Sequence, residues 1–266
     1  MDYLTRIRAR ARGEERGVPG FLHDKTRATQ FVEMIGGPTL KTLRTFEKPT
    51  EFNFDGLPET FVLKPTFSSS SLGVMVLERR ENSKFHDHLR NRALETNAIQ
   101  TEQIRLAERH PKSKHQWIVE EKVKDAEGHF VPDDYKFYCF QGDIGLVHRT
   151  IRRSPLNQHA YYDGDFVPLH DPDGTVIWTH DGILDRVQVA PPENWEQMLN
   201  VARRISVAVP SPFVRVDMYN TPSGPVFGEF TLVPGTFFYE DREKMSLPLS
   251  TQLGRLWEQA EKKLRR

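Results

Sequence analysis

Apolar and polar residues alternate along several short segments of the chain, and this spacing predicts β-strands. The segments with this pattern are 59–64, 74–77, 116–123, 135–140, 144–151, 213–219 and 226–232. Helical spacing and capping signals predict helices at 26–35, 83–109, 194–209 and from 249 onward. Strands outnumber helices and the two do not alternate regularly. The sequence therefore predicts an α+β arrangement of antiparallel hairpins with helices packed on one side.

The two predicted strands nearest the C-terminus, 213–219 and 226–232, form a hairpin around a turn rich in Pro, Ser and Gly. A register centred on Ser223 places Asp217 directly opposite Glu229. Like charges in that position destabilise a sheet unless a cation lies between them. Oxygen ligands of this kind suit Mg²⁺ shared with phosphates, so the pair is a candidate metal site. The alternative is two solvated acids on an exposed hairpin, which is the commoner arrangement.

The same register assigns the neighbouring side chains to the two faces of the hairpin. Arg215 lies opposite Thr231, and Tyr219 lies opposite Phe227. Because strand side chains alternate between faces, Arg215 and Thr231 share a face with the two carboxylates. The other face carries the apolar residues Val214, Val216, Met218 and Phe230. A guanidinium beside the acids and an apolar layer behind them favour the metal site.

Two lysines are candidates for binding phosphates. Lys64 ends an otherwise apolar strand and precedes a loop with four consecutive serines, 68–71, and Gly73. Backbone amides, hydroxyls and the ammonium can surround a phosphate chain, although serine-rich loops are more often flexible connectors. Lys136 is flanked by aromatic residues on a mostly apolar strand. It must meet an anion or extend to water, and extending to water is the default.

Two further sets of charged residues carry weaker signals. Glu120 and Glu121 end an apolar strand, where an exposed strand end is the simpler interpretation. The strand after Lys136 adds three cations that could instead form a surface patch, namely Arg149, Arg152 and Arg153.

Composition limits the function classes. The 266 residues include 37 basic and 37 acidic side chains, so the balanced charge implies no general attraction to nucleic acid or membranes. A single cysteine, Cys139, excludes an intramolecular disulfide and fits a reducing, cytoplasmic setting. We expect neither a membrane span nor a secretory signal. The basic segment 3–16 is expected to be a solvated helix or a frayed end, with binding to a partner or anionic surface as the alternative.

Taken in order, these segments resemble the ATP-grasp superfamily, and most closely its teichuronopeptide-biosynthesis (TupA-like) group. The resemblance extends from about residue 23 to beyond 240. It rests on His23-Asp-Lys25, Phe61-Val-Leu-Lys-Pro65, Ile118-Val-Glu-Glu121, Asp134-Tyr-Lys-Phe137, Arg149, Arg215-Val-Asp217 and Gly228-Glu-Phe-Thr231. The hairpin is the most specific of these motifs, because the family places Arg-x-Asp on one strand and Glu-x-Asn on the next.

The resemblance implies an ATP-grasp fold, in which two α+β subdomains clasp a nucleotide, without a full N-terminal pre-grasp domain. It divides the chain into a basic arm at 1–22, a first subdomain with a serine-rich lid at 23–124, and a second subdomain with the metal hairpin at 125–266. Two departures stand out. Thr231 occupies the usual asparagine position, which implies a weaker metal position, and the lid has serines where relatives carry more glycine.

The resemblance also implies a role for each matching residue. ATP would be held by Lys25, Lys64, Lys136, the lid residues Ser68, Ser69, Ser70, Ser71 and Gly73, and an adenine hinge at Glu120, Glu121 and Val123. Mg²⁺ would be held by Asp217, Glu229 and Thr231. The ribose would meet Asp125 or Glu127, a choice that stays open. Catalysis would depend on Arg215, Lys136 and Arg149, with Arg215 stabilising charge on the reacting carboxyl or phosphoryl oxygens.

The activity implied by the resemblance is an ATP- and Mg²⁺-dependent carboxylate–amine ligase that forms an amide through an acyl phosphate and releases ADP and phosphate. The substrates would be small-molecule, peptide or glycan-precursor acids and amines. Neither nucleic acid nor a membrane is expected as a partner, and a homodimer is one option for the assembly. Two alternatives stay open: a phosphotransferase (kinase) acting on a small molecule or glycan, and a non-catalytic nucleotide-binding subunit.

Overall fold

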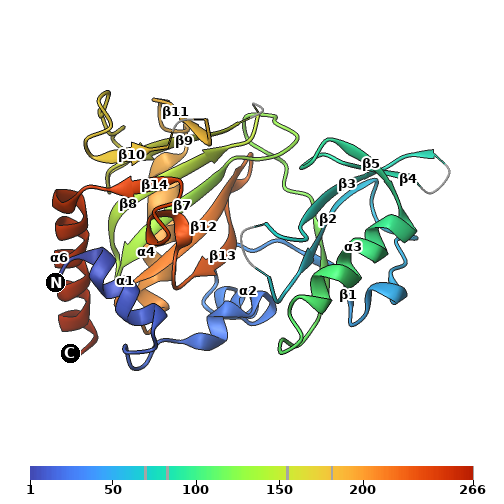
Figure 1. Cartoon of the computed structure of the whole chain (residues 1–266), viewed down its shortest axis with the longest axis horizontal. Coiled ribbons are helices and arrows are strands. Elements are labelled where there is room, and N and C mark those ends of the chain that lie inside the picture. The colour runs from blue at the N-terminus through green and yellow to red at the C-terminus, as the bar shows by residue number, and fades with distance from the viewer. Residues whose placement is uncertain (69–70, 82–83, 154–155, 181, 266) are drawn as a thin grey trace.

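Two six-stranded sheets, each with helices packed against it, form the framework of this computed structural model (Figure 1). The structure describes residues 1–68, 71–81, 84–153, 156–180 and 182–265. Both sheets are built mainly from antiparallel neighbours, which confirms the predicted α+β class. Among the described residues, no helix is both long enough and apolar enough to cross a membrane.

The first sheet has the strand order β1-β6-β2-β3-β4-β5. Its strands are β1 (Thr42–Phe46), β2 (Thr60–Pro65), β3 (Met75–Arg79), β4 (Lys84–Asp87), β5 (Arg92–Glu95) and β6 (Trp117–Glu121), with α3 (Thr96–Glu108) and the short 3-10 helix η2 (Pro49–Glu51) beside them. Alternation along β2 turns Phe61 and Leu63 into an aromatic core that also contains Ile99 of α3. There the Trp117 indole donates to the Gln103 amide oxygen at 2.9 Å. The residues of β2 that alternate with Phe61 and Leu63 point to the opposite face of the sheet.

The helix predicted over 83–109 is wrong in its first half, where β4 and β5 form a hairpin before α3 begins. Phe85 pairs with Leu94 across this hairpin and is buried in the first sheet's core. Asn91 adopts a positive φ of 47° in the connection, a conformation that asparagine tolerates better than most residues. Burial of one aromatic side chain by distant segments outweighed the polar local pattern.

The second sheet has the strand order β11-β9-β8-β7-β12-β13. Its strands are β7 (Asp134–Phe140), β8 (Asp143–Ile151), β9 (Asn157–Tyr162), β11 (Leu184–Arg186), β12 (Val214–Thr221) and β13 (Gly224–Thr231). One face packs against α4 (Trp195–Ala208), α2 (Lys25–Met34) and the 3-10 helix η1 (Gly20–His23). Part of the other face is covered by α1 (Tyr3–Ala11), α5 (Gly235–Phe238), α6 (Leu247–Leu264) and the ribbon of β10 (Ile177–Thr179) with β14 (Glu243–Met245).

The basic segment at the N-terminus packs differently from the sequence-based expectation. The helix α1 is neither solvated nor frayed, because Tyr3 and Ile7 are buried against α6 and the second sheet. Its Arg10 is also buried and donates to the backbone oxygens of Phe213 and Leu232, each at 3.0 Å. The next helix, α2, contacts β13 of the second sheet. The division of the chain at residues 22 and 124 therefore stays a prediction.

The β12–β13 hairpin has the predicted register at its functional end. Asp217 lies opposite Glu229, and the next pair, Arg215 with Thr231, is also as predicted. A bulge follows, because Gly228 is passed over in the pairing, and Tyr219 consequently pairs with Val226 rather than Phe227. A Cβ at Gly228 would lie 3.0 Å from the Tyr219 ring, so glycine permits this close approach.

Candidate active site

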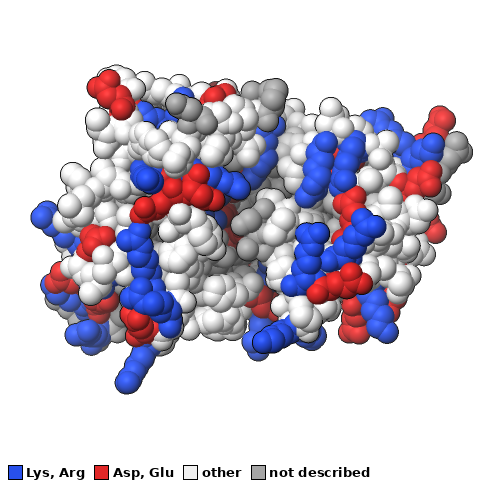
Figure 2. Space-filling model, viewed as in Figure 1, with Lys and Arg blue, Asp and Glu red and all other residues white. Residues whose placement is uncertain are grey.

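A cleft of about 880 Å³ lies between the two sheets. Figure 2 shows the molecule hollowed between its two halves, with basic and acidic side chains mixed around the hollow. The lining comes from β2, β3 and β6 on one side, from β7, β12 and β13 on the other, and from α2 and neighbouring loops.

The first sheet lines the cleft largely with apolar side chains. Val62 of β2 and Val76 of β3 face it, together with Val74 just before β3. Their sequence neighbours, including Leu63 and Leu77, fill the aromatic core on the opposite face. Loop residues complete the apolar surface, namely Leu40, Leu89, Val131 and Pro132. The period-two pattern of β2 and β3 already carried the signal for this surface, and the sequence analysis assigned it no role.

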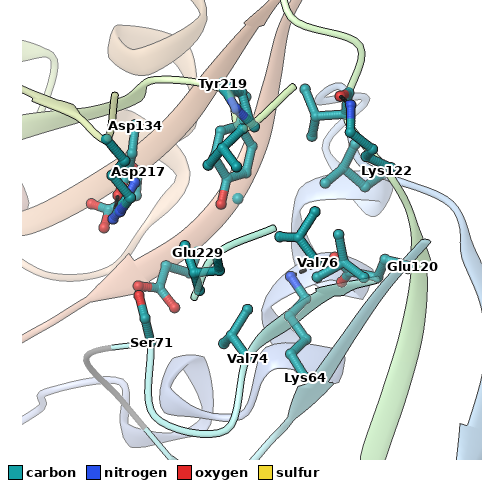
Figure 3. A pocket seen from close by; sticks show the side chains of 18 of the residues that line it. Lys64, Ser71, Val74, Val76, Glu120, Lys122, Asp134, Asp217, Tyr219 and Glu229 are labelled. Atoms are coloured by element: carbon teal, nitrogen blue, oxygen red, sulfur yellow. Dashed lines mark hydrogen bonds and ion pairs between the residues drawn. The ribbon is translucent and has the colours of Figure 1, made fainter. Parts of the chain in front are cut away.

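One ion pair interrupts the apolar surface. Lys64 of β2 and Glu120 of β6 pair within the cleft lining, with exposed fractions of only 8% and 5% (Figure 3). Nearby, Lys25 at the start of α2 donates to the backbone oxygens of Pro65 (3.1 Å) and Ser68 (3.0 Å). Burial lowers the pKa of Lys25 and Lys64 lowers it further, while the charge of Glu229 opposes both effects. Lys25 and Lys64, two of the three lysines expected to hold ATP, therefore both line the cleft, whereas Lys136 does not.

The serine-rich loop contributes Ser71 to the cleft, whereas Ser68 and Gly73 are not in its lining. Ser69 and Ser70 lie outside the described residues. The hydroxyl of Ser68 donates to the Leu72 oxygen at 2.6 Å. Gly73 has a positive φ of 76°, and a Cβ there would lie 2.3 Å from the Leu106 side chain. Glycine is required at this position, where the chain passes directly against α3.

The second sheet presents charged side chains to the same cleft. Asp217 and Glu229 both line it, and Figure 3 shows Glu229 projecting toward Ser71. Arg215 binds both carboxylate oxygens of Asp217, at 2.7 and 2.6 Å, and donates to the Thr231 hydroxyl at 2.8 Å. Neither Arg215 nor Thr231 is in the lining. Arg215 orients the Asp217 carboxylate, and Thr231 in turn accepts from Arg215. Asp217 and Glu229 therefore have different surroundings.

Asp134 and Arg152 extend this charged surface, and sequence analysis gave neither a role in the site. Lys136 of β7 forms an ion pair with Asp134 and donates to the Thr150 hydroxyl at 3.2 Å, without lining the cleft itself. Burial opposes ionisation of Asp134, yet the charges of Lys136 and Arg152 lower its pKa to about 2. Burial raises the pKa of Asp217 to about 6 despite Arg215, and the charge of Asp134 contributes. The environment thus shifts the pKa values of Asp134 and Asp217 in opposite directions.

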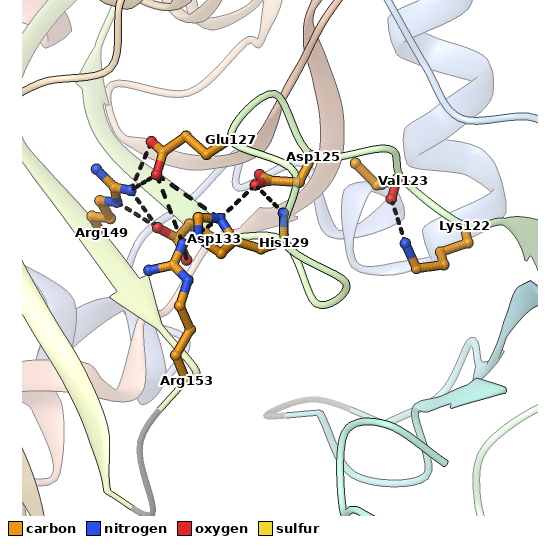
Figure 4. Close-up of polar contacts among 8 residues, drawn as sticks. All are labelled: Lys122, Val123, Asp125, Glu127, His129, Asp133, Arg149 and Arg153. Atoms are coloured by element: carbon orange, nitrogen blue, oxygen red, sulfur yellow. Dashed lines mark hydrogen bonds and ion pairs between the residues drawn. The ribbon is translucent and has the colours of Figure 1, made fainter. Parts of the chain in front are cut away.

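Arg149, predicted to be catalytic, lies outside the cleft lining. Its guanidinium pairs with Asp133 at 2.6 Å and with both oxygens of Glu127 at 2.9 Å (Figure 4). Asp125 accepts from the His129 ring at 2.8 Å in the same cluster. Neither Asp125 nor Glu127, the two alternatives for the ribose, lines the cleft. These side chains brace the loop between β6 and β7.

The predicted adenine hinge is only partly in the cleft. Glu120 and Val123 line it, and the adjacent Lys122, which sequence analysis overlooked, does so too. Glu121 is exposed and interacts with Lys41 instead. Its carboxylate accepts from the Lys41 backbone N–H at 2.8 Å, and its own backbone N–H donates to the Lys41 carbonyl at 3.0 Å. Tyr219 is a second overlooked lining residue, although its place on the Asp217 face of β12 follows from simple alternation.

A family model described as TupA-like ATPgrasp matches residues 6–251. Three solved structures share the fold. The D-alanine–D-alanine ligase from Bacillus anthracis complexed with ATP has a TM-score of 0.52 and 18% identity over 92% of this chain and 68% of its own. The VanG D-Ala:D-Ser ligase from Enterococcus faecalis has a TM-score of 0.52 and 18% identity over 92% and 62%. D-alanyl-alanine synthetase A from Vibrio cholerae has a TM-score of 0.50 and 15% identity over 90% and 64%.

These likenesses confirm the predicted ATP-grasp fold. The chain spans less than two thirds of the second and third structures. No curated protein matches the chain significantly.

Proposed function

The chain belongs to the TupA-like ATP-grasp family, and from this premise we propose that it is an ATP- and Mg²⁺-dependent carboxylate–amine ligase. ATP phosphorylates a carboxylate, an amine captures the acyl phosphate, and an amide, ADP and phosphate are released. One observation carries the proposal: a cleft with two lysines beside an apolar surface on one side faces the carboxylates of Asp217 and Glu229 on the other. That combination suits a nucleotide whose phosphates meet a divalent cation.

The first sheet supplies the nucleotide site. The flat adenine ring lies against the valines of β2 and β3, where burial of apolar area stabilises it. Lys64 and Lys25 donate to the phosphates, and Ser71 closes over them. Lys64 is held in place by Glu120 before the nucleotide arrives. Its charge is therefore positioned in advance, which reduces the entropy lost on binding.

The residues of the hairpin fit Mg²⁺. Among the described residues no cationic side chain pairs with the Glu229 carboxylate, which projects into the cleft (Figure 3). Asp217 is oriented by Arg215 and offers a second oxygen donor of the kind that Mg²⁺ prefers. The Thr231 hydroxyl accepts from Arg215, so we assign Thr231 to positioning Arg215 rather than to the metal. When bound, Mg²⁺ neutralises charge on the phosphate oxygens and aligns them for transfer.

Arg215 is the candidate for stabilising negative charge that develops during the reaction. Its Nε and Nη2 atoms are occupied by Asp217 and Thr231. The Nη1 atom donates to no group within the described part of the chain, and we assign it to an oxyanion of the acyl phosphate or of the tetrahedral adduct, although Arg215 itself lies behind the cleft lining. Lys136, one strand away from Asp217, adds positive charge behind the carboxylates. Arg149 acts indirectly, by fixing the loop that carries Val131 and Pro132.

The test is a screen of candidate acids and amines for ADP release, with ¹⁸O in the carboxylate of each acid. A ligase that uses an acyl phosphate gives ADP, phosphate and amide in equal amounts, and one labelled oxygen appears in the phosphate. AMP with pyrophosphate would exclude the acyl-phosphate route. A stable phosphorylated product that needs no amine would establish a kinase instead. ATP binding without any product, across acids and amines of all classes tested, would support a non-catalytic nucleotide-binding subunit.

A further inference from the structure

Two histidines and a glutamate converge on the second sheet without lining the cleft. His148 comes from β8, His159 from β9 and Glu243 from β14. One potential ligand atom of each lies within 4.8 Å of the other two. His148 and Glu243 are each 1% exposed, whereas the His159 side chain is 12% exposed and leaves a route to solvent. Three elements that are distant in sequence thus bring metal-binding side chains to one point.

Glu243 is a buried carboxylate without a permanent counter-charge among the residues that the structure describes. The Tyr161 hydroxyl donates to one of its oxygens at 2.5 Å, and His159 Nδ1 lies 3.0 Å from the other. No lysine or arginine of the described residues forms an ion pair with it. A buried carboxylate is costly unless a cation and hydrogen bonds compensate it. A bound cation would supply what the protein side chains do not.

His148 provides an independent indication of a missing ligand. Its Nδ1 atom is buried and has no hydrogen-bond partner among the described residues. Its Nε2 atom lies 3.4 Å from the Thr150 hydroxyl, a long contact. The ring is 4.3 Å from that of His159, centroid to centroid, and stacks on Tyr161 at 4.7 Å. An unsatisfied buried nitrogen is unfavourable, and a bound ion or water is one of the explanations for it.

We propose that His148, His159 and Glu243 bind a divalent transition-metal ion, with Zn²⁺ as the best match, at a site separate from the Mg²⁺ of the cleft. Two imidazole nitrogens and one carboxylate oxygen are a known zinc donor set, which a water molecule completes to a tetrahedron. Zinc bonds of about 2.0–2.2 Å place ligand atoms roughly 3.3–3.6 Å apart. The His159–Glu243 separation of 3.0 Å is already close to that spacing, and a ring nitrogen of His148 lies within 4.8 Å of both ligand atoms.

The surroundings suit such an ion. Tyr161 binds the second oxygen of Glu243 and fixes the orientation of the carboxylate, as outer hydrogen bonds do at metal sites. Because β14 pairs with β10, the ion would fasten this ribbon to β8 and β9 of the second sheet. In the strand registers His148 pairs with Lys136, which pairs with Asp217. The site therefore lies on the same sheet face as the Mg²⁺ carboxylates, two strands or about 10 Å away.

The proposal is tested on the full chain by stripping it of metal and titrating it with Co²⁺, whose visible absorption reports a tetrahedral site. We expect one Co²⁺ per chain, displaced by one Zn²⁺, and a melting temperature that rises on metal addition. His148→Gln and Glu243→Gln should each weaken binding more than 100-fold. The exposed His170→Gln is the matched histidine control, and Asp217→Asn is the control for the cleft; both should retain one tetrahedral Co²⁺.

Tyr161→Phe keeps the ring and removes only the outer hydrogen bond. It should weaken Co²⁺ binding about tenfold, and it keeps the test decisive if the ligand variants do not fold. The proposal is overturned if the stripped wild-type chain takes up no Co²⁺ or Zn²⁺ at equimolar concentration. It is also overturned if the ligand variants bind as well as wild type, or if Asp217→Asn alone abolishes the tetrahedral spectrum.

Discussion

The two sheets face the same cleft with opposite kinds of surface. The first sheet presents valines and one ion pair, Lys64 with Glu120, whose charges cancel. The second presents a network in which Arg215 compensates Asp217, while Glu229 in the same lining has no cationic side chain paired with it in the described part of the chain. A surface that contacts only the part of the ligand that does not react stabilises the ground state and the transition state equally. A charged surface with uncompensated groups can favour the transition state, so we assign binding to the first sheet and chemistry to the second.

The largest expected effect is on turnover when either hairpin acid is replaced. Glu229→Gln and Asp217→Asn should each lower kcat by about 1,000-fold, because loss of a metal ligand removes several kcal/mol of charge stabilisation. Steady-state ADP release with the acid and amine found by the screen measures this. Near-native kcat in either variant at saturating Mg²⁺ would contradict the metal assignment. It would also contradict the assignment of chemistry to the second sheet.

The same two variants should differ in stability, because the two carboxylates have different surroundings. Asp217→Asn leaves Arg215 buried without its carboxylate partner and should lower the free energy of unfolding of the metal-free protein, by less above pH 6, where burial disfavours the ionised Asp217. Glu229→Gln removes one of two facing like charges and should stabilise it slightly. Urea unfolding in the presence of chelator measures both. Equal destabilisation by the two substitutions would contradict the asymmetry between the acids.

A pH series tests whether burial of Asp217 causes the difference between the two acids. Burial raises the pKa of Asp217 to about 6 from an ordinary value of 3.8, so protonation favours the folded state. The contribution is full below pH 3.8 and is lost as the pH rises through 6. Asp134, whose pKa is lowered to about 2, stabilises the folded state fully above pH 3.8 and loses this contribution only as the pH falls through 2, outside the window tested.

Without metal, the free energy of unfolding of wild type minus that of Asp217→Asn should therefore fall between pH 4.5 and 7.5. Arg215, Lys136, Asp134 and Glu229 surround the carboxylate and remain unchanged in this difference. The exposed Asp165→Asn serves as the control acid. A difference that stays constant over this range would show that Arg215 outweighs burial.

Arg215→Lys keeps the charge and shortens the hydrogen-bonding group. It should lower the rate of amide formation by about 100-fold with little change in ATP affinity, since the lost donors act on charge present only during the reaction. Calorimetry of ATP binding beside single-turnover amide formation separates the two quantities. An equal loss in affinity and rate would move Arg215 from chemistry to ground-state binding.

The smallest effect is expected on the first sheet. Lys64→Met should weaken ATP binding by about tenfold, at the low end for a charge-assisted contact, because phosphate replaces an existing partner, Glu120. The variant Lys64→Met with Glu120→Gln is the control, since it avoids leaving a buried carboxylate unpaired. Both should retain most of kcat at saturating ATP. Unchanged nucleotide affinity by calorimetry would make Lys64 a purely structural residue.

The sequence alone determined those features that depend on local periodicity and turn chemistry. Alternation along 213–219 and 226–232 was sufficient to place Asp217 opposite Glu229 and Arg215 beside them. The order of the motifs was sufficient for the family. Both follow from short-range geometry, since a strand exposes every second residue on the same face wherever it packs.

Tertiary structure decided whatever depended on distant partners. The docking of α1 against α6 and the burial of Phe85 of the β4–β5 hairpin in the first sheet's core each depend on contacts between segments that are far apart in the chain. Arg149 lies outside the cleft because it forms ion pairs with Asp133 and Glu127 in the loop between β6 and β7. His148, His159 and Glu243 carried no motif, since they meet only after β8, β9 and β14 pack together. Local pattern fixes which face a side chain occupies, whereas packing fixes what it meets there.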